Sequence, residues 1–133
     1  MAAAGYATHF VGKWDCGAAT PHHTPFGRNY STALNYFGHG NYQWGELEWN
    51  GNFRDLWLND KPAAALANAS RDKMIYEEVI FREQLLGIVD AHPPGLPLFL
   101  VYAARIAHYP IQAPIEYQKL PHIAKIDTPH RLV

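Results

Sequence analysis

The amino-terminal segment reads Gly5-Tyr6-Ala7-Thr8-His9-Phe10-Val11-Gly12-Lys13-Trp14-Asp15-Cys16-Gly17. The β-branched and aromatic residues between Thr8 and Trp14 predict a short buried strand that ends near a glycine. Lys13 stands at the end of this strand, and Asp15 follows two residues later. An ammonium group at a strand end can hold an oxyanion, although many such lysines are simply solvated. The segment therefore predicts an early strand and a local anion-handling site.

The remainder of the chain predicts one long irregular segment and a strand–helix–strand unit. Residues 15–52 are rich in glycine and show neither helical nor strand periodicity, as in a functional loop. Residues 53–58 predict a strand that enters a tight turn, and residues 72–91 predict an amphipathic helix stopped by Pro93-Pro94-Gly95. The apolar run 96–104 predicts a strand buried on both faces.

This order of elements predicts an α/β fold, with a mixed or parallel sheet and a crossover helix. We expect a single unit over residues 1–133, in which an irregular segment at about 15–52 lies on the active-site side. The strand–helix–strand unit is expected at about 53–104. No internal repeat or low-complexity tract divides the chain.

Composition and charge exclude several functional classes. The 133 residues are 48% hydrophobic and 17% charged, which is typical of a globular chain, and the net charge is −1. That balance gives no electrostatic case for binding nucleic acid or an anionic membrane surface. The run 96–104 is too short to span a membrane. A single cysteine, Cys16, excludes an intrachain disulfide framework.

His108 is the second candidate for a functional side chain. It follows the apolar run 96–104 and precedes Pro110, so it projects from the carboxyl end of a strand, where open α/β sheets bind ligands. A packed histidine bonded to backbone fits the residue type equally well. The eight histidines form no helical pair and no zinc-like spacing with cysteine, which argues against a histidine-built metal site.

Aromatic residues alternate with glycines between Asn35 and Trp49. Trp44 is the candidate there for stacking on a sugar or an aryl group. Packing of the same rings onto the core of their own loop is an equally acceptable interpretation.

Several of these motifs, in this order and spacing, resemble the arylsulfatase family. They are Gly12-Lys13-Trp14, the phrase Asp55-Leu56-Trp57-Leu58-Asn59-Asp60-Lys61-Pro62, and the run Pro97–Ala104 that leads into His108-Tyr109-Pro110-Ile111-Gln112-Ala113-Pro114. The resemblance covers most of the chain, and residues 20–52 diverge most from the family pattern.

The resemblance implies a partial alkaline-phosphatase-like fold, truncated at both ends, and hydrolysis of sulfate esters. In that family a formylglycine made from cysteine attacks sulfur while a calcium ion polarises the oxygens. Lys13 and His108 then match the residues that contact the sulfate or the formylglycine, and Gln112 becomes a substrate-binding candidate. The implied partners are a small sulfate ester or a sulfated glycan; the oligomeric state stays open.

Three departures from the family pattern limit what this chain is expected to do alone. Asp15 stands where the family usually has histidine, and a carboxylate there repels a sulfate ester unless it is protonated or paired. Cys16 is not in the phrase of the modified cysteine, so we do not expect it to be the nucleophile. The calcium-binding acids of the family lie outside the chain, so no metal ligand is expected within it.

We therefore expect a parent protein that hydrolyses sulfate esters and a chain that is inactive by itself. Two other functions stay open: a non-catalytic module that binds sulfated glycans, and a phosphate or phosphonate hydrolase of the same superfold. A product that does not fold alone is a further alternative. Two glycosylation acceptor patterns, Asn29-Tyr30-Ser31 and Asn68-Ala69-Ser70, favour a secreted or lysosomal parent, but the compartment stays open.

Overall fold

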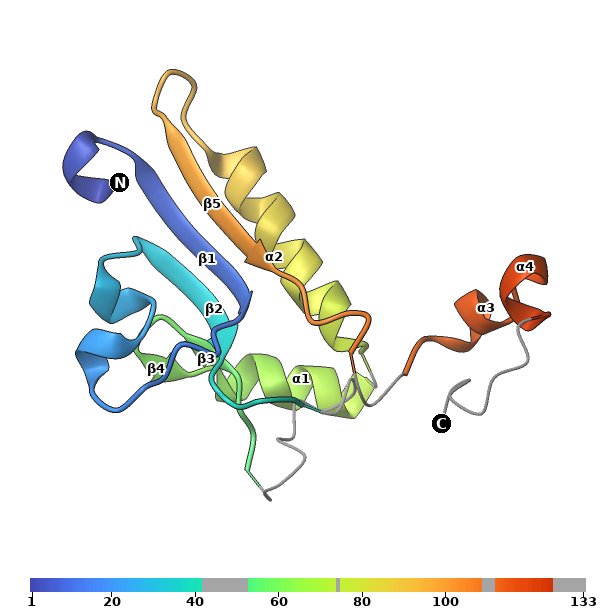
Figure 1. Ribbon diagram of the computed structural model, residues 1–133. Helices are drawn as coiled ribbons and strands as arrows, with labels where there is room; N and C mark the ends of the chain where they lie inside the picture. The colour runs from blue at the N-terminus through green and yellow to red at the C-terminus, as the bar shows by residue number, and fades with distance from the viewer. Residues whose placement is uncertain (42–52, 74, 109–111, 126–133) are drawn as a thin grey trace.

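A computed structural model describes residues 1–41, 53–73, 75–108 and 112–125, and shows an α/β fold built on a five-stranded mixed sheet (Figure 1). The strand order is β4-β3-β2-β1-β5. The strands are β1 (Ala7–Lys13), β2 (Thr32–Tyr36), β3 (Trp57–Leu58), β4 (Lys61–Pro62) and β5 (Leu98–Ala103). The α-helices are α1 (Ala64–Lys73), α2 (Glu77–Ala91), α3 (Ile115–Gln118) and α4 (Pro121–Ala124), and three short 3-10 helices cover Ala2–Ala4, Pro21–His23 and Phe26–Arg28.

Strand β1 lies between β2 and β5 and runs parallel to both. Its side chains alternate between two cores because successive residues of a strand point to opposite faces. Val11 packs in the larger core with Leu34 of β2 and Phe81 of α2. Phe10 packs on the opposite face, where its ring meets Trp14 edge-on at 5.1 Å. The strand predicted from the amino-terminal segment is confirmed.

Strand β2 corrects the expectation that residues 15–52 are irregular throughout. Thr32–Tyr36 pairs with β1 in parallel and with β3 in antiparallel register, so this strand joins the two parts of the sheet. Four of its five residues are buried. Burial on both faces removes the alternation by which a half-buried strand is detected, and the run is only five residues long.

The tight turn predicted after residues 53–58 is confirmed, but the strand before it covers only Trp57–Leu58. Trp57–Leu58 pairs with Lys61–Pro62 around the turn at Asn59-Asp60, and Asn59 adopts a left-handed φ of 58°. An asparagine tolerates that conformation better than most residues. The Asn59 Oδ1 also accepts a 2.9 Å hydrogen bond from the Ala33 N–H, which attaches the turn to β2.

The helix predicted at 72–91 begins later, at Glu77, and a separate helix that was not predicted, α1, precedes it and ends at Lys73. Tyr76 is extended (φ −67°, ψ 131°) and serves as the N-cap residue of α2. Glu77 and Glu78 occupy the first turn of α2, where negative charge complements the helix dipole. The predicted carboxyl end of the helix, Ala91, is correct.

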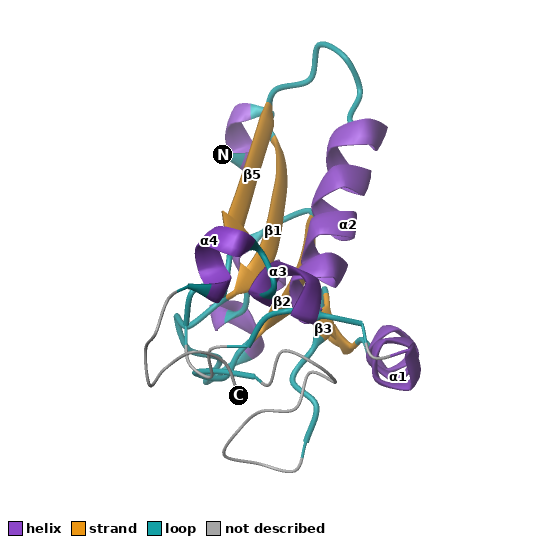
Figure 2. Cartoon of the chain, turned by 90° about the vertical axis from the view of Figure 1, so that its right-hand side faces the viewer, coloured by secondary structure: helices purple, strands orange, loops and turns teal. Residues whose placement is uncertain are grey.

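Strand β5 is half-buried rather than buried on both faces as expected. It pairs with β1 alone among the described strands, and α2 runs alongside it (Figures 1 and 2). Tyr102 near its end keeps 41% of its surface exposed. The apolar composition of 96–104 thus identified a strand correctly and overstated its burial.

Gly12 is required where β1 and β5 approach each other. Its φ is 108°, and a Cβ built at this position would lie 2.1 Å from the backbone oxygen of Ala103. No side chain fits there, and the neighbouring atoms belong to backbone that cannot move without breaking the sheet. The glycine of the Gly12-Lys13-Trp14 motif therefore sets the sheet geometry directly before Lys13.

We expect Gly12→Ala to lower the free energy of unfolding by about 3 kcal/mol or more, since left-handed strain adds to a backbone clash. Gly17→Ala is the matched control, because Gly17 has a φ of 81° but nothing within 4 Å of the added Cβ. The control is expected to cost about 1 kcal/mol. Urea denaturation followed by tryptophan fluorescence measures both, and equal losses in the two variants would contradict this account.

Candidate functional site

The two principal candidates, Lys13 and His108, lie at the end of the sheet where the parallel strands β1 and β5 have their carboxyl ends. Gly12 pairs with Ala103 in the parallel β1–β5 register, so Lys13 ends β1 at the level where β5 also ends. The chain then continues from Ala103 to His108. Carboxyl ends of adjacent parallel strands are the usual ligand-binding edge of an α/β sheet. The structure therefore brings to one edge two residues that are far apart in the sequence.

Lys13 and Asp15 form an ion pair, with 3.3 Å between Nζ and Oδ2. The lysine side chain is 17% exposed and the aspartate side chain 55% exposed. The turn bends back on itself because Asp15 has a φ of 50° and Gly17 a φ of 81°. The Trp14 Nε1–H donates to the Gly17 oxygen at 2.9 Å and closes the turn. Cys16 is an exposed free thiol on the same turn.

His39 is a further residue of this site that sequence reasoning missed. Its ring lies edge-on to that of His108, with centroids 5.5 Å apart and planes at 76°. His39 follows β2, just as His108 follows β5, and both of those strands are parallel to β1. His39 lies three residues after β2, and this position could have identified it. It was missed because β2 itself was not predicted.

Buried carboxylates hold the segments that leave these strands. Asp55 is 3% exposed; its Oδ2 accepts from the backbone N–H groups of Phe37 and Gly38, the latter directly before His39. Asn41 donates from Nδ2 to the Asp55 backbone oxygen at 3.0 Å and to Glu77 Oε1 at 3.1 Å. Such bonds offset the desolvation cost of burying charge. The segment after β2 is thus fixed by side chains from two other parts of the chain.

Three tyrosine hydroxyls near this edge are held in the protonated form. Burial raises the pKa of Tyr36, and the nearby carboxylate of Glu77 adds to the effect. Burial likewise raises the pKa of Tyr102, followed by its hydrogen bond to Glu78, and burial raises the pKa of Tyr76. These hydroxyls can serve as hydrogen-bond donors at neutral pH, but not as phenolate bases.

Gln112 and His108 both line a pocket of about 680 Å³ between α2 and the start of α3. The Gln112 backbone oxygen accepts a 3.0 Å hydrogen bond from the Tyr76 hydroxyl. Its candidacy as a substrate-binding residue stays a prediction. Trp44, the other substrate-binding candidate, lies outside the described residues, as does most of the aromatic loop.

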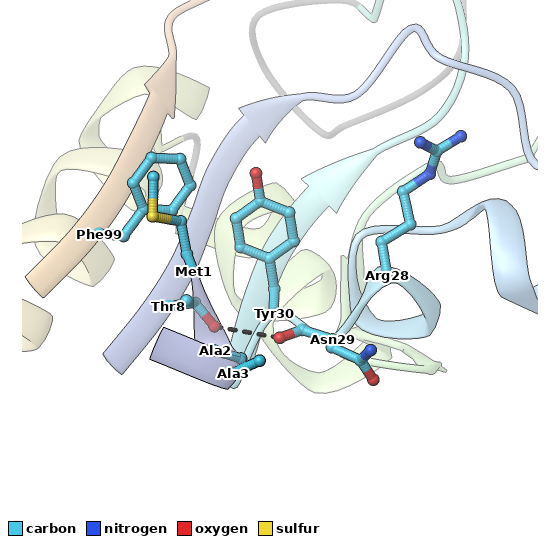
Figure 3. Close-up of a pocket in the computed structure, with 8 residues that line it drawn as sticks. All are labelled: Met1, Ala2, Ala3, Thr8, Arg28, Asn29, Tyr30 and Phe99. Carbon is cyan, nitrogen blue, oxygen red and sulfur yellow. Dashed lines mark hydrogen bonds between the residues drawn. The ribbon is translucent and has the colours of Figure 1, made fainter. Parts of the chain in front are cut away.

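A smaller pocket of about 340 Å³ lies at the opposite, amino-terminal end of β1 (Figure 3). Thr8, Tyr30 and Phe99 contribute to its walls, and Tyr30 stacks on Phe99 with centroids 6.2 Å apart. Its lining includes none of the candidate site residues Lys13, Asp15, His108 and Gln112. We therefore do not include it in the candidate site.

Within the described ranges, no group of three or more histidine, cysteine, aspartate or glutamate side chains could hold a metal ion. Those residues do not fit the calcium ion that the resemblance implies, and we assign it no step. Across the same ranges, no helix is both long and apolar enough to cross a membrane.

Comparison with known proteins adds evidence from outside the structure. No family model matches the chain. The chain is 33% identical to Arylsulfatase J of Mus musculus over an alignment of 121 residues, which covers 85% of this chain. This match supports a relation to sulfatases. The aligned part is 19% of the mouse protein, so the chain spans about a fifth of the length of that relative.

We expect Asp15→Asn to strengthen the binding of inorganic sulfate about two- to fivefold, because it releases Lys13 from its ion pair and removes a repelling charge. Asparagine also tolerates the left-handed backbone at this position. NMR titration of the 133-residue chain with sodium sulfate at constant ionic strength measures the affinity. Asp90→Asn, an exposed change at the far end of α2, is the control for net charge. Unchanged or weaker binding by Asp15→Asn would contradict the expectation.

Proposed function

We propose that this chain is a section of a sulfuric ester hydrolase, and that the parent protein hydrolyses sulfate esters with Lys13 and His108 at its active site. The observation that carries the proposal is the position of these two residues beyond adjacent ends of the parallel strands β1 and β5. The similarity to a protein named arylsulfatase over 85% of the chain supports the same reaction class. A partial alkaline-phosphatase-like fold is part of the proposal, and the mixed α/β sheet is compatible with it.

The chemistry divides between the two side chains. The Lys13 ammonium offsets the negative charge of the sulfate oxygens, and the His108 imidazole donates a hydrogen bond to the same group. Hydrolysis consumes one water and releases sulfate and an alcohol. The resemblance implies a formylglycine nucleophile and a calcium ion. We propose that the formylglycine and the calcium ligands belong to other parts of the parent protein, and that this chain alone does not turn over substrate.

Asp15 competes with a sulfate ester for the Lys13 ammonium group. A sulfate ester that reaches Lys13 must compete with the carboxylate at 3.3 Å from Nζ. Because Asp15 is more exposed than Lys13, it can turn into solvent without losing buried contacts. In the proposed site, substrate binding therefore exchanges one anionic partner of Lys13 for another.

We expect the isolated chain to show no turnover of 4-nitrophenyl sulfate in the presence of calcium, yet to bind inorganic sulfate. Lys13→Ala is expected to weaken sulfate binding about tenfold, since a charge-assisted hydrogen bond is lost. Lys61→Ala, at an exposed position on the far edge of the sheet, is the control. Release of 4-nitrophenol is followed by absorbance, and binding by NMR.

Two results would contradict the proposal in different ways. Turnover by the isolated chain that Lys13→Ala abolishes would show that the chain is active alone. Sulfate binding that is unaffected by both Lys13→Ala and His108→Ala would remove the proposed site. Titration with a sulfated and a desulfated oligosaccharide tests the glycan-binding alternative, which requires a preference for the sulfated form.

A further inference from the structure

The segment that carries His108 is attached on both sides to the start of α2. Before His108, the backbone N–H groups of Arg105 and Ile106 donate to Glu78 Oε1 at 2.9 and 3.2 Å. After it, the Tyr76 hydroxyl donates to the Gln112 oxygen at 3.0 Å. The position of the imidazole thus depends on two side chains from the first residues of one helix.

We propose that Glu78 is the positioning residue of this site, holding the segment between β5 and His108 so that the imidazole stands beside His39 and beyond the end of β1. The inference deepens the proposed function and rests on it for the role of His108. In this proposal Glu78 acts through the backbone N–H groups of Arg105 and Ile106 and through the Tyr102 hydroxyl.

The contacts of the Glu78 carboxylate differ from those of an acid that only stabilises the first turn of its own helix. An acid in the first turn of a helix commonly serves the dipole and free amides of its own helix. Glu78 instead accepts from Arg105 and Ile106 at Oε1 and from the Tyr102 hydroxyl at Oε2. All three donors belong to the end of β5 or the segment directly after it.

Burial makes these bonds obligatory. Glu78 is 8% exposed, and a buried carboxylate is tolerated only when its oxygens are hydrogen-bonded. If the segment 105–106 moved away, two backbone N–H groups would lose their acceptor, and Glu78 Oε1 would lose both of these donors. The segment therefore has one strongly preferred position, and His108 follows two residues beyond it.

The geometry at His39 shows what this positioning achieves. The segment after β2 is held by Asp55 through the N–H groups of Phe37 and Gly38, and the segment after β5 is held by Glu78. The two imidazoles that follow meet at 5.5 Å between ring centroids. Two independent buried carboxylates thus determine one side-chain contact at the candidate site.

The test compares Glu78→Gln with Glu83→Gln in the 133-residue chain by NMR. Glutamine keeps the shape of glutamate but removes the charge, and Glu83 is an exposed acid on the same helix. In the Glu78 variant we expect the nuclear Overhauser effect between the His39 and His108 rings to be lost, and the His108 ring shifts to move. Sulfate affinity is expected to fall at least about tenfold, the scale on which a displaced contact group loses its effect.

His9 serves as an internal reference, because a variant that destabilises the whole fold would also change the ring shifts of His9. Its Nδ1 lies 2.7 Å from Thr32 Oγ1, near the amino ends of β1 and β2. We expect the His9 ring shifts to stay unchanged in both variants. Equal changes at His9 and His108 would show a merely structural role and overturn the proposal, as would a His39–His108 contact that persists in the Glu78 variant.

Tyr102→Phe keeps the inference testable if Glu78→Gln does not fold. This change removes one donor to Glu78 from a side chain that is 41% exposed, so the fold should tolerate it. It is expected to move His108 in the same direction by a smaller amount, and unchanged His108 shifts would overturn the proposal. If the unaltered chain binds no sulfate but Glu78→Gln still displaces His108, the positioning role stands and the proposed function fails.

Discussion

The close approach of β1 and β5 at Gly12 is the constraint on which the rest of the structure depends. Because a Cβ at this position would overlap the Ala103 backbone, the parallel pairing of the two strands requires glycine here. That pairing brings the ends of β1 and β5 to one level. Lys13 and the segment leading to His108 then start from neighbouring points, although the two residues lie 95 positions apart in the sequence.

Beyond the ends of the strands, buried carboxylates accept hydrogen bonds from backbone N–H groups that no longer pair within the sheet. Backbone groups that leave a sheet lose their ladder partners and must find others when they stay buried. Asp55 supplies acceptors after β2 and Glu78 supplies them after β5. The turn after β1 is held differently, by the Trp14 indole on the Gly17 oxygen and by the ion pair of Lys13 with Asp15. A different set of side-chain interactions therefore holds the segment that follows each of the three parallel strands.

How far the sequence predicted the structure depended on whether a pattern was local. The strand before Lys13, the turn at Asn59-Asp60 and the carboxyl end of α2 were correct, since each is marked by residues adjacent to it. Strand β2 was missed because burial on both faces hides its period. The break between α1 and α2 was missed because the extended conformation of Tyr76 has no strong marker in the sequence.

For the candidate site, the sequence by itself determined the chemistry that is available: a cation after a glycine, a histidine after an apolar strand, and an acid two residues from the cation. Only the tertiary structure decided which groups meet. It paired Asp15 with Lys13, set His39 against His108, and directed Glu78 to the backbone of another segment. These contacts join residues on different elements, and their partners are fixed by sheet register and burial, which no local pattern of residues encodes.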